Sequence, residues 1–194
     1  MKDSRITKLA NNLLNYSVKL QKNEKILIEI IGKDAIPLGK ELIKQAENIG
    51  AYPFFNIIDS EIMREMIINC KEEQMQIYAK HDLQRMKDMD AYIGIRATEN
   101  TAELNGIPKE KMEIYNKYYT LQVHFEERVK NTKWCILRYP NASMAQMSNM
   151  NTEEFEDFYF NVCTLDYNKM SKAMDNLVDL MNRTKKVHII RRRN

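Results

Sequence analysis

The 194-residue chain lacks any long apolar run. No apolar segment approaches the roughly 18 residues that a membrane-spanning helix needs, and residues 1–5 lead into a polar helix instead of the apolar stretch of a signal peptide. We therefore expect a cytoplasmic protein with no membrane partner. Its 44% of apolar residues is still enough to build a core.

Cysteine is also scarce. Cys70, Cys135 and Cys163 lie far apart in the sequence, and each is part of an apolar pattern. An odd number of scattered thiols favours buried, reduced cysteines and argues against a disulfide framework or a zinc cluster.

The sequence has three histidines, which fall in separate predicted elements. His81 lies between charged residues and is expected on a helix surface. His124 is close to two glutamates on another helix, and an exposed ion pair is the favoured interpretation. His188 lies in a predicted strand and has no neighbouring ligand in the sequence. Since catalytic ions need ligands that converge on one point, we predict no metal site in this chain.

Glycine-rich and nucleophile motifs are absent. Gly32 is the one glycine in the loop after the first predicted strand, whereas a dinucleotide fold needs Gly-x-Gly-x-x-Gly there. The sequence contains no Gly-x-Ser-x-Gly elbow, no Walker sequence and no His-Glu-x-x-His pair. These absences exclude the common serine hydrolases, ATPases and zincins, and no residue of the chain is assigned a catalytic role.

The net charge of +3 comes from one place, Arg191–Arg193 near the C-terminus. Without these three arginines, 27 basic residues (30 minus 3) balance 27 acidic ones. A nucleic-acid surface needs basic residues clustered on a folded face, so we expect no nucleic-acid partner.

Four apolar segments predict strands. Residues 25–31 form a near-continuous β-branched run, which is typical of a strand covered on both faces, and residues 52–58 repeat the pattern. Segments with helical spacing alternate with the strands, and parallel strands need such crossovers. We predict a three-layer, doubly wound α/β fold, with a mainly parallel sheet of four or more strands and helices on both faces. The other two predicted strands are residues 90–96 and 134–139.

Capping residues set the expected helix limits. Ser4 and Asp34 are candidate N-caps, Pro37 suits a first helical turn, and Gly50 suits a left-handed stop. Asn151 is expected to cap a helix whose first turns are acidic, which gives the carboxylates there a structural role and not a catalytic one. Those carboxylates are Glu153, Glu154, Glu156 and Asp157. Residues 187–190 predict a further strand.

One region carries a family resemblance. Residues 138–150 read Arg-Tyr-Pro-Asn-Ala-Ser-Met-Ala-Gln-Met-Ser-Asn-Met, an acidic helix follows, and residues 166–170 read Asp-Tyr-Asn-Lys-Met. Upstream, residues 97–104 contain a Glu-Asn loop, and Pro108-Lys109 begins a helix. Together with residues 22–25, this order resembles the aminopeptidase T and aminopeptidase S family of metal-dependent exopeptidases over residues 1–190.

The resemblance implies a bipartite enzyme. Residues 1–190 would form its N-terminal α/β domain, residues 191–194 a basic tail outside the family pattern, and a C-terminal domain missing from this chain would hold a pair of divalent metals such as zinc or cobalt. It further implies a homodimer that acts on peptides. We therefore expect a truncated chain whose domain walls the cavity of an aminopeptidase that releases N-terminal residues, and which by itself is inactive and holds no cofactor.

The loop after the fourth strand is the predicted cavity wall. Because α/β sheets bind ligands beyond the carboxyl ends of their strands, and because the resemblance is densest there, we expect Pro140, Ala145, Gln146 and Met150 to line the substrate cavity. Packing of this short helix against the domain is the alternative. At the level of function, the alternative is a stand-alone α/β module that binds a small ligand or a protein.

Overall fold

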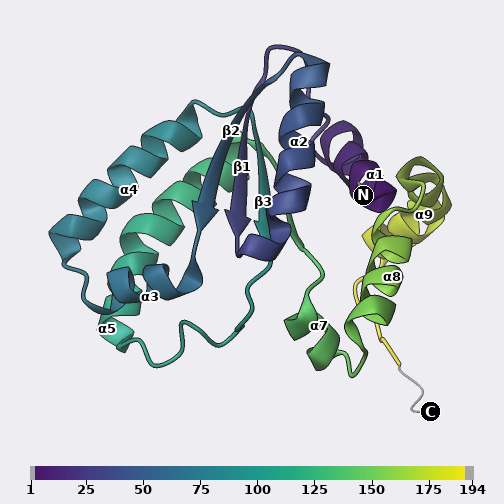
Figure 1. Ribbon diagram of the computed structural model, residues 1–194. Helices are drawn as coiled ribbons and strands as arrows, with labels where there is room; N and C mark the ends of the chain where they lie inside the picture. The colour runs from purple at the N-terminus through teal and green to yellow at the C-terminus, as the bar shows by residue number, and fades with distance from the viewer. Residues whose placement is uncertain (1–2, 191–194) are drawn as a thin grey trace.

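The structure is a computed structural model that describes residues 3–190 (Figure 1). The predicted basic tail at residues 191–194 lies outside this part of the chain. The first half contains α1 (Ser4–Asn12), η1 (Leu13–Ser17), β1 (Lys25–Ile31), η2 (Lys33–Ala35), α2 (Ile36–Ile49), β2 (Tyr52–Ile58), α3 (Ser60–Ile68) and α4 (Glu72–Lys87). The second half contains β3 (Ala91–Arg96), α5 (Lys109–Tyr115), η3 (Asn116–Arg128), α6 (Val129–Asn131), β4 (Lys133–Arg138), α7 (Ala142–Met147), α8 (Thr152–Cys163) and α9 (Tyr167–Arg183).

The strands of the described residues form one parallel sheet in the order β2-β1-β3-β4. Figure 1 shows α2 on one side of the sheet and α4 with the long helix after α5 on the other. The predicted three-layer, doubly wound α/β fold is confirmed. Its physical basis is the crossover that each parallel pair requires, which places a helix over the sheet after each strand.

Alternate residues of the central strands fill two separate cores. Ile28 and Ile93 point to the face covered by α1, η1, α2 and α8, where they join a large apolar cluster. Leu27 and Tyr92 point to the opposite face, where they pack against α4 and η3. Both faces of β1 and β3 are therefore covered, as their continuous apolar sequences predict.

Strand β2 differs from this expectation. It pairs with β1 along its whole length, yet it is one of the two edge strands and it exposes large apolar side chains on both faces. The prediction that this run is covered on both sides is wrong for the described residues. The exposed side chains are Tyr52, Phe54, Phe55 and Ile57.

Several helix ends match their predicted signals. Gly50 ends α2 in the left-handed conformation with φ 83°, and the side chain of Asn151 accepts a hydrogen bond from the backbone of Glu154 at the start of α8. Two predicted caps are wrong. Asp3 caps α1 in place of Ser4, and α2 begins after the short helix η2, with no side-chain cap from Asp34.

Every helix among residues 3–190 is too short or too polar to cross a bilayer.

The chain after α8 gives a further correction. Residues 187–190 are predicted as a strand, but they form no strand in the structure, and Ile189 and Ile190 are 93% and 87% exposed. A β-branched run becomes a strand only where a neighbouring strand supplies its hydrogen bonds. Helix α9, which precedes it, buries none of its residues and exposes Met174, Leu177, Val178, Leu180 and Met181.

Candidate functional site

The carboxyl ends of the four strands define the site. The strand order reverses between β1 and β3, because β2 is added on one side of β1 and β3 on the other. The loops that follow β1 and β3 therefore lead to opposite faces of the sheet. Doubly wound α/β folds bind ligands at such a switch point. The two loops approach closely. Gly32 has φ 88°, and a Cβ there would lie 2.2 Å from the carbonyl oxygen of Ala97, so only glycine fits.

A first hollow of about 400 Å³ opens over the ends of β1, β2 and β3. Lys33 and Glu99 form an ion pair of 3.1 Å, which joins the loop after β1 to the loop after β3. Glu99 raises the pKa of Lys33 through this contact. The other lining residues are Gly32, Asp59, Ser60, Glu61, Thr98, Asn100 and Glu103.

The polar groups of the first hollow serve mainly to hold its own loops. The side chain of Asp59 accepts hydrogen bonds from the backbone of Glu61 and Ile62 and so caps α3. Asn100 accepts a bond from the backbone of Ala102 and donates one to Glu103 at 2.9 Å. The acidic character of this hollow is thus explained by helix and turn formation.

A second, smaller hollow of about 40 Å³ lies between the ends of β3 and β4. Arg96 and Arg138, the last residues of these strands, are partners in the register and both line the hollow. Asn141 lies between the two loops and is 6% exposed. This pair of arginines was not predicted as a site, although each lies at the carboxyl end of a predicted strand, which was the available signal.

The predicted cavity-lining residues lie beside this second hollow in different environments. Pro140 is buried, and Ala145 is 2% exposed within the core on the α1 and α2 face. Met150 packs against the same core, whereas Gln146 is exposed at the end of α7. The structure thus brings the loop to the predicted edge of the sheet, and its contact with a substrate stays a prediction.

The three histidines occupy two kinds of environment. His81 is exposed, as predicted. The prediction of an exposed ion pair for His124 is wrong, because its ring packs edge-on against Tyr92 and Tyr119, and its buried Nδ1 has no hydrogen-bond partner among the described atoms. Burial, with the Arg128 and Arg96 cations, lowers the pKa of His124 from 6.5 to about 4. His188 is exposed.

The structure gives the cysteines and the acidic residues of α8 structural positions. Cys70 is buried, while Cys135 and Cys163 are partly buried, and all three are free thiols. In α8, Asp157 and Glu156 form ion pairs with Arg5 of α1. These carboxylates therefore join two helices at the surface.

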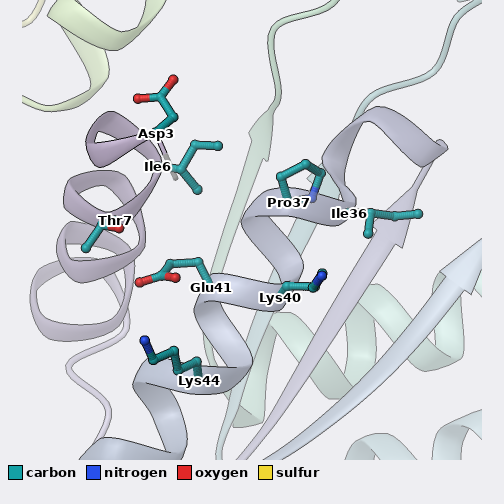
Figure 2. A pocket seen from close by; sticks show the side chains of 8 residues that line it. All are labelled: Asp3, Ile6, Thr7, Ile36, Pro37, Lys40, Glu41 and Lys44. Atoms are coloured by element: carbon teal, nitrogen blue, oxygen red, sulfur yellow. The ribbon is translucent and has the colours of Figure 1, made fainter. Parts of the chain in front are cut away.

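A third hollow, the α1–α2 groove, lies away from the strand ends (Figure 2). It encloses about 530 Å³, and Figure 2 shows Glu41 and Lys44 pointing toward α1 while Lys40 points away from it. Glu41 is buried and accepts a hydrogen bond from Gln45. The groove mixes apolar side chains with two lysines and two carboxylates, and it presents no group poised for chemistry. Its remaining lining residues are Asp3, Ile6, Thr7, Ile36 and Pro37.

The fold and the position of the first two hollows define a doubly wound α/β domain with two hollows among the loops at its strand ends. Sequence comparison then assigns the chain more narrowly. The model of the thermophilic metalloprotease family (M29) matches residues 2–190, and the chain belongs to that family. None of the curated proteins matches its sequence.

Solved structures support the fold. The domain is similar to wild-type AmpT from Thermus thermophilus, with a TM-score of 0.60 and 17% identity over 83% of this chain. The chain spans only 43% of the length of AmpT. An alcohol dehydrogenase superfamily protein from Novosphingobium aromaticivorans matches 84% of this chain and 49% of its own, at 11% identity, but the TM-score of 0.35 supports no argument.

The family description implies a metal, which requires several ligating side chains that converge on one point. Among residues 3–190, no three or more histidine, cysteine, aspartate or glutamate side chains lie together in a way that could hold an ion. The one orphaned imidazole nitrogen, on His124, faces a cationic and aromatic environment that disfavours a metal. These residues do not fit a catalytic metal centre, and no reaction step is assigned to them.

Proposed function

We propose that this chain is the N-terminal domain of a metal-dependent aminopeptidase, and that it walls the cavity in which a second domain releases N-terminal residues from peptides. The observation that carries the proposal is the match of the metalloprotease family over residues 2–190. The similarity to AmpT supports it. The matched part is less than half of the AmpT chain, so the remainder of AmpT is long enough to form a second domain. By this proposal the described domain alone hydrolyses no peptide.

The strand ends are the proposed cavity side of the domain. Ligands of parallel α/β sheets bind there because loops from several strands converge at that edge. Two hollows already open at this edge, and α7 carries the exposed Gln146 beside them. We propose that the loop formed by residues 140–150 contacts the peptide and that a divalent metal pair is held by the second domain.

Partners and location are part of the same proposal. The exposed apolar side chains of β2 and α9 are surfaces that stable proteins usually cover. We propose that α9 packs against the metal-binding domain, that β2 lies at a homodimer contact, and that the enzyme works in the cytoplasm.

A chimera tests the proposal. Residues 2–190 would replace the matched part of AmpT, and release of free amino acids from di- and tripeptides would be followed with zinc or cobalt and with a chelator. We expect metal-dependent, chelator-sensitive release by the chimera and none by the 194-residue chain alone. A folded, metal-loaded chimera that releases nothing would contradict the proposal and favour a stand-alone binding module. Equally, release by the isolated chain would contradict it.

The same chimera tests the loop. Gln146→Ala is expected to weaken peptide turnover while the melting temperature stays unchanged, because Gln146 is exposed. His81→Ala is the matched control, since His81 is also exposed but lies on α4, remote in sequence from the strand-end loops. Full turnover in both variants would show that the loop is only structural.

A further inference from the structure

Two arginines lie side by side at the strand ends and have no side-chain partner in the part of the chain that the structure describes. Arg96 and Arg138 end adjacent parallel strands and are directly paired in the register. Like charges at such positions repel and reduce stability. Among residues 3–190, neither guanidinium takes part in a hydrogen bond or an ion pair. Stability alone therefore gives no reason for this pair.

The loops around the pair are held rigidly by Asn141. Its side-chain amide donates a hydrogen bond to the carbonyl oxygen of Thr98 at 3.1 Å, and its Oδ1 accepts one from the backbone of Met144 at 3.0 Å. The backbone of Tyr139 also donates to the carbonyl of Arg96 at 2.9 Å, which extends the ladder past the strands. A buried asparagine thus joins the loop after β3 to the loop after β4.

The carboxylates nearest in the fold are already engaged. Glu99 pairs with Lys33, and Glu103 accepts a bond from Asn100. On the sheet face that carries both arginines, the buried Glu29 accepts a hydrogen bond of 2.7 Å from the hydroxyl of Tyr92. Among residues 3–190, none of these carboxylates forms an ion pair with Arg96 or Arg138.

A third cation lies behind them on the same face. Arg128 is 7% exposed, and its guanidinium lies 4.8 Å from the ring of Tyr92 and 5.0 Å from that of Trp134. Its Nε and Nη1 have no hydrogen-bond partner among the described atoms. Burial lowers the pKa of Arg128 and the Arg96 cation adds to this, whereas Tyr92 and the Glu29 carboxylate oppose it.

We propose that Arg96 and Arg138 together bind the C-terminal carboxylate of a short peptide in the hollow between β3 and β4. This inference rests on the proposed function. A guanidinium matches a carboxylate through two parallel hydrogen bonds, which a single ammonium cannot supply. The hollow of about 40 Å³ has room for a group of a few atoms, and Thr98 and Thr101 line it. A carboxylate held here selects peptides by length, because it must lie within reach of the cleaved bond.

Nuclear magnetic resonance titration of the full 194-residue chain tests this inference. Trialanine, trialanine with an amidated C-terminus, and inorganic phosphate would each be added, and the backbone amide signals of Thr98, Thr101 and Asn141 followed. We expect trialanine to shift these signals and the amidated peptide to bind at least about tenfold more weakly, as loss of a charge-assisted hydrogen bond predicts. Arg96→Gln and Arg138→Gln should each weaken trialanine binding by a similar factor.

Controls separate charge from geometry. Arg183→Gln removes the same charge from α9, outside the strand ends, and should leave binding unchanged. Arg96→Lys and Arg138→Lys keep the positive charge but cannot form two parallel hydrogen bonds to a carboxylate. Their affinity for trialanine can be measured even if the glutamine variants fold poorly. We expect binding weaker than wild type for both lysine variants.

Three results would overturn the inference: equal binding of the free and amidated peptides, tighter binding of phosphate than of trialanine, or binding that neither arginine variant changes. The measurement involves no hydrolysis. An inactive chimera with intact carboxylate binding would therefore count against the proposed function alone, whereas an active chimera without carboxylate binding would count against this inference alone.

Discussion

Strands β1 and β2 have the same length and similar apolar sequences, yet they occupy opposite environments. They are paired residue by residue, so that Ile28 of β1 lies beside Phe55 of β2 on one face of the sheet. Ile28 is 0% exposed and Phe55 is 60% exposed. The comparison teaches that an apolar run identifies a strand, whereas the position of the strand in the sheet decides how much of it is buried.

The largest expected effect comes from truncating this register pair. Ile28→Ala should lower the free energy of unfolding by about 2–5 kcal/mol, since it removes buried methyl groups and leaves a cavity. Phe55→Ala should change it by less than about 1 kcal/mol because the ring is largely in solvent. Chemical denaturation of the two variants measures both values. Equal losses would show that β2 is as well packed in solution as β1.

Protonation of His124 should have the next largest effect on the free energy of unfolding. Its pKa is lowered from 6.5 to about 4, so between these values the unfolded chain binds a proton at this site that the folded chain does not. Stability contributed by this site is therefore present above pH 6.5 and falls as the pH drops to about 4, by roughly 2–4 kcal/mol.

Denaturation between pH 4 and pH 7 checks the prediction for His124. His124→Gln should flatten the pH profile relative to wild type. His81→Gln should leave the profile as it is, because His81 is exposed. A profile that His124→Gln does not alter would refute the buried, neutral state of this imidazole.

A hydrogen bond in the central sheet provides a smaller test. Tyr92→Phe removes the donor to the buried Glu29 and should cost about 1–3 kcal/mol, because the carboxylate loses that partner. Tyr52→Phe on β2 is the matched control, since Tyr52 is 54% exposed and should show almost no change. Thermal unfolding of both variants at pH 7 gives the difference. A comparable loss in the control would remove the contrast between the central and edge strands.

A charged residue on the edge strand β2 should have the smallest effect on stability and a larger effect on self-association of the chain. Phe55→Lys should alter the free energy of unfolding by about 0.5 kcal/mol or less, yet it should reduce self-association through β2, since a charge on an edge strand opposes edge-to-edge pairing. Sedimentation velocity over a range of concentrations measures this. Ile77→Lys, a change of the same kind on an exposed residue of α4, is the control. If both variants associate like wild type, β2 forms no contact between copies.

Much of the fold could be predicted because its signals are local. Strands β1 and β2 have the predicted limits, β3 and β4 differ from prediction by one residue at their ends, and the break near Cys70 separates α3 from α4. Gly50 and Asn151 act as predicted because each satisfies backbone groups within a few residues of itself. The strand at residues 187–190 was wrong because its hydrogen bonds would have to come from another segment.

The candidate site was less predictable. The loop of residues 140–150 lies at the carboxyl edge of the sheet because parallel strands all end on one side, and its contact with a substrate stays a prediction. His124 was misplaced, since its two glutamate neighbours in sequence pointed to the surface while Tyr92 and Tyr119 enclose the ring in space. The pairing of Arg96 with Arg138 was not foreseen, because it depends on β3 and β4 being neighbours in register.

The sequence by itself determined the alternation of strands and helices, the parallel sheet, and the edge at which its loops gather, because these follow from periodicity, capping and the length of each crossover. Only the tertiary structure decided that β2 is the exposed edge strand, that His124 is buried beside cations, and that two arginines 42 residues apart in the sequence (138 minus 96) meet at one hollow. The physical reason is that burial and charge depend on neighbours in space, and strand order brings together residues that no local pattern connects.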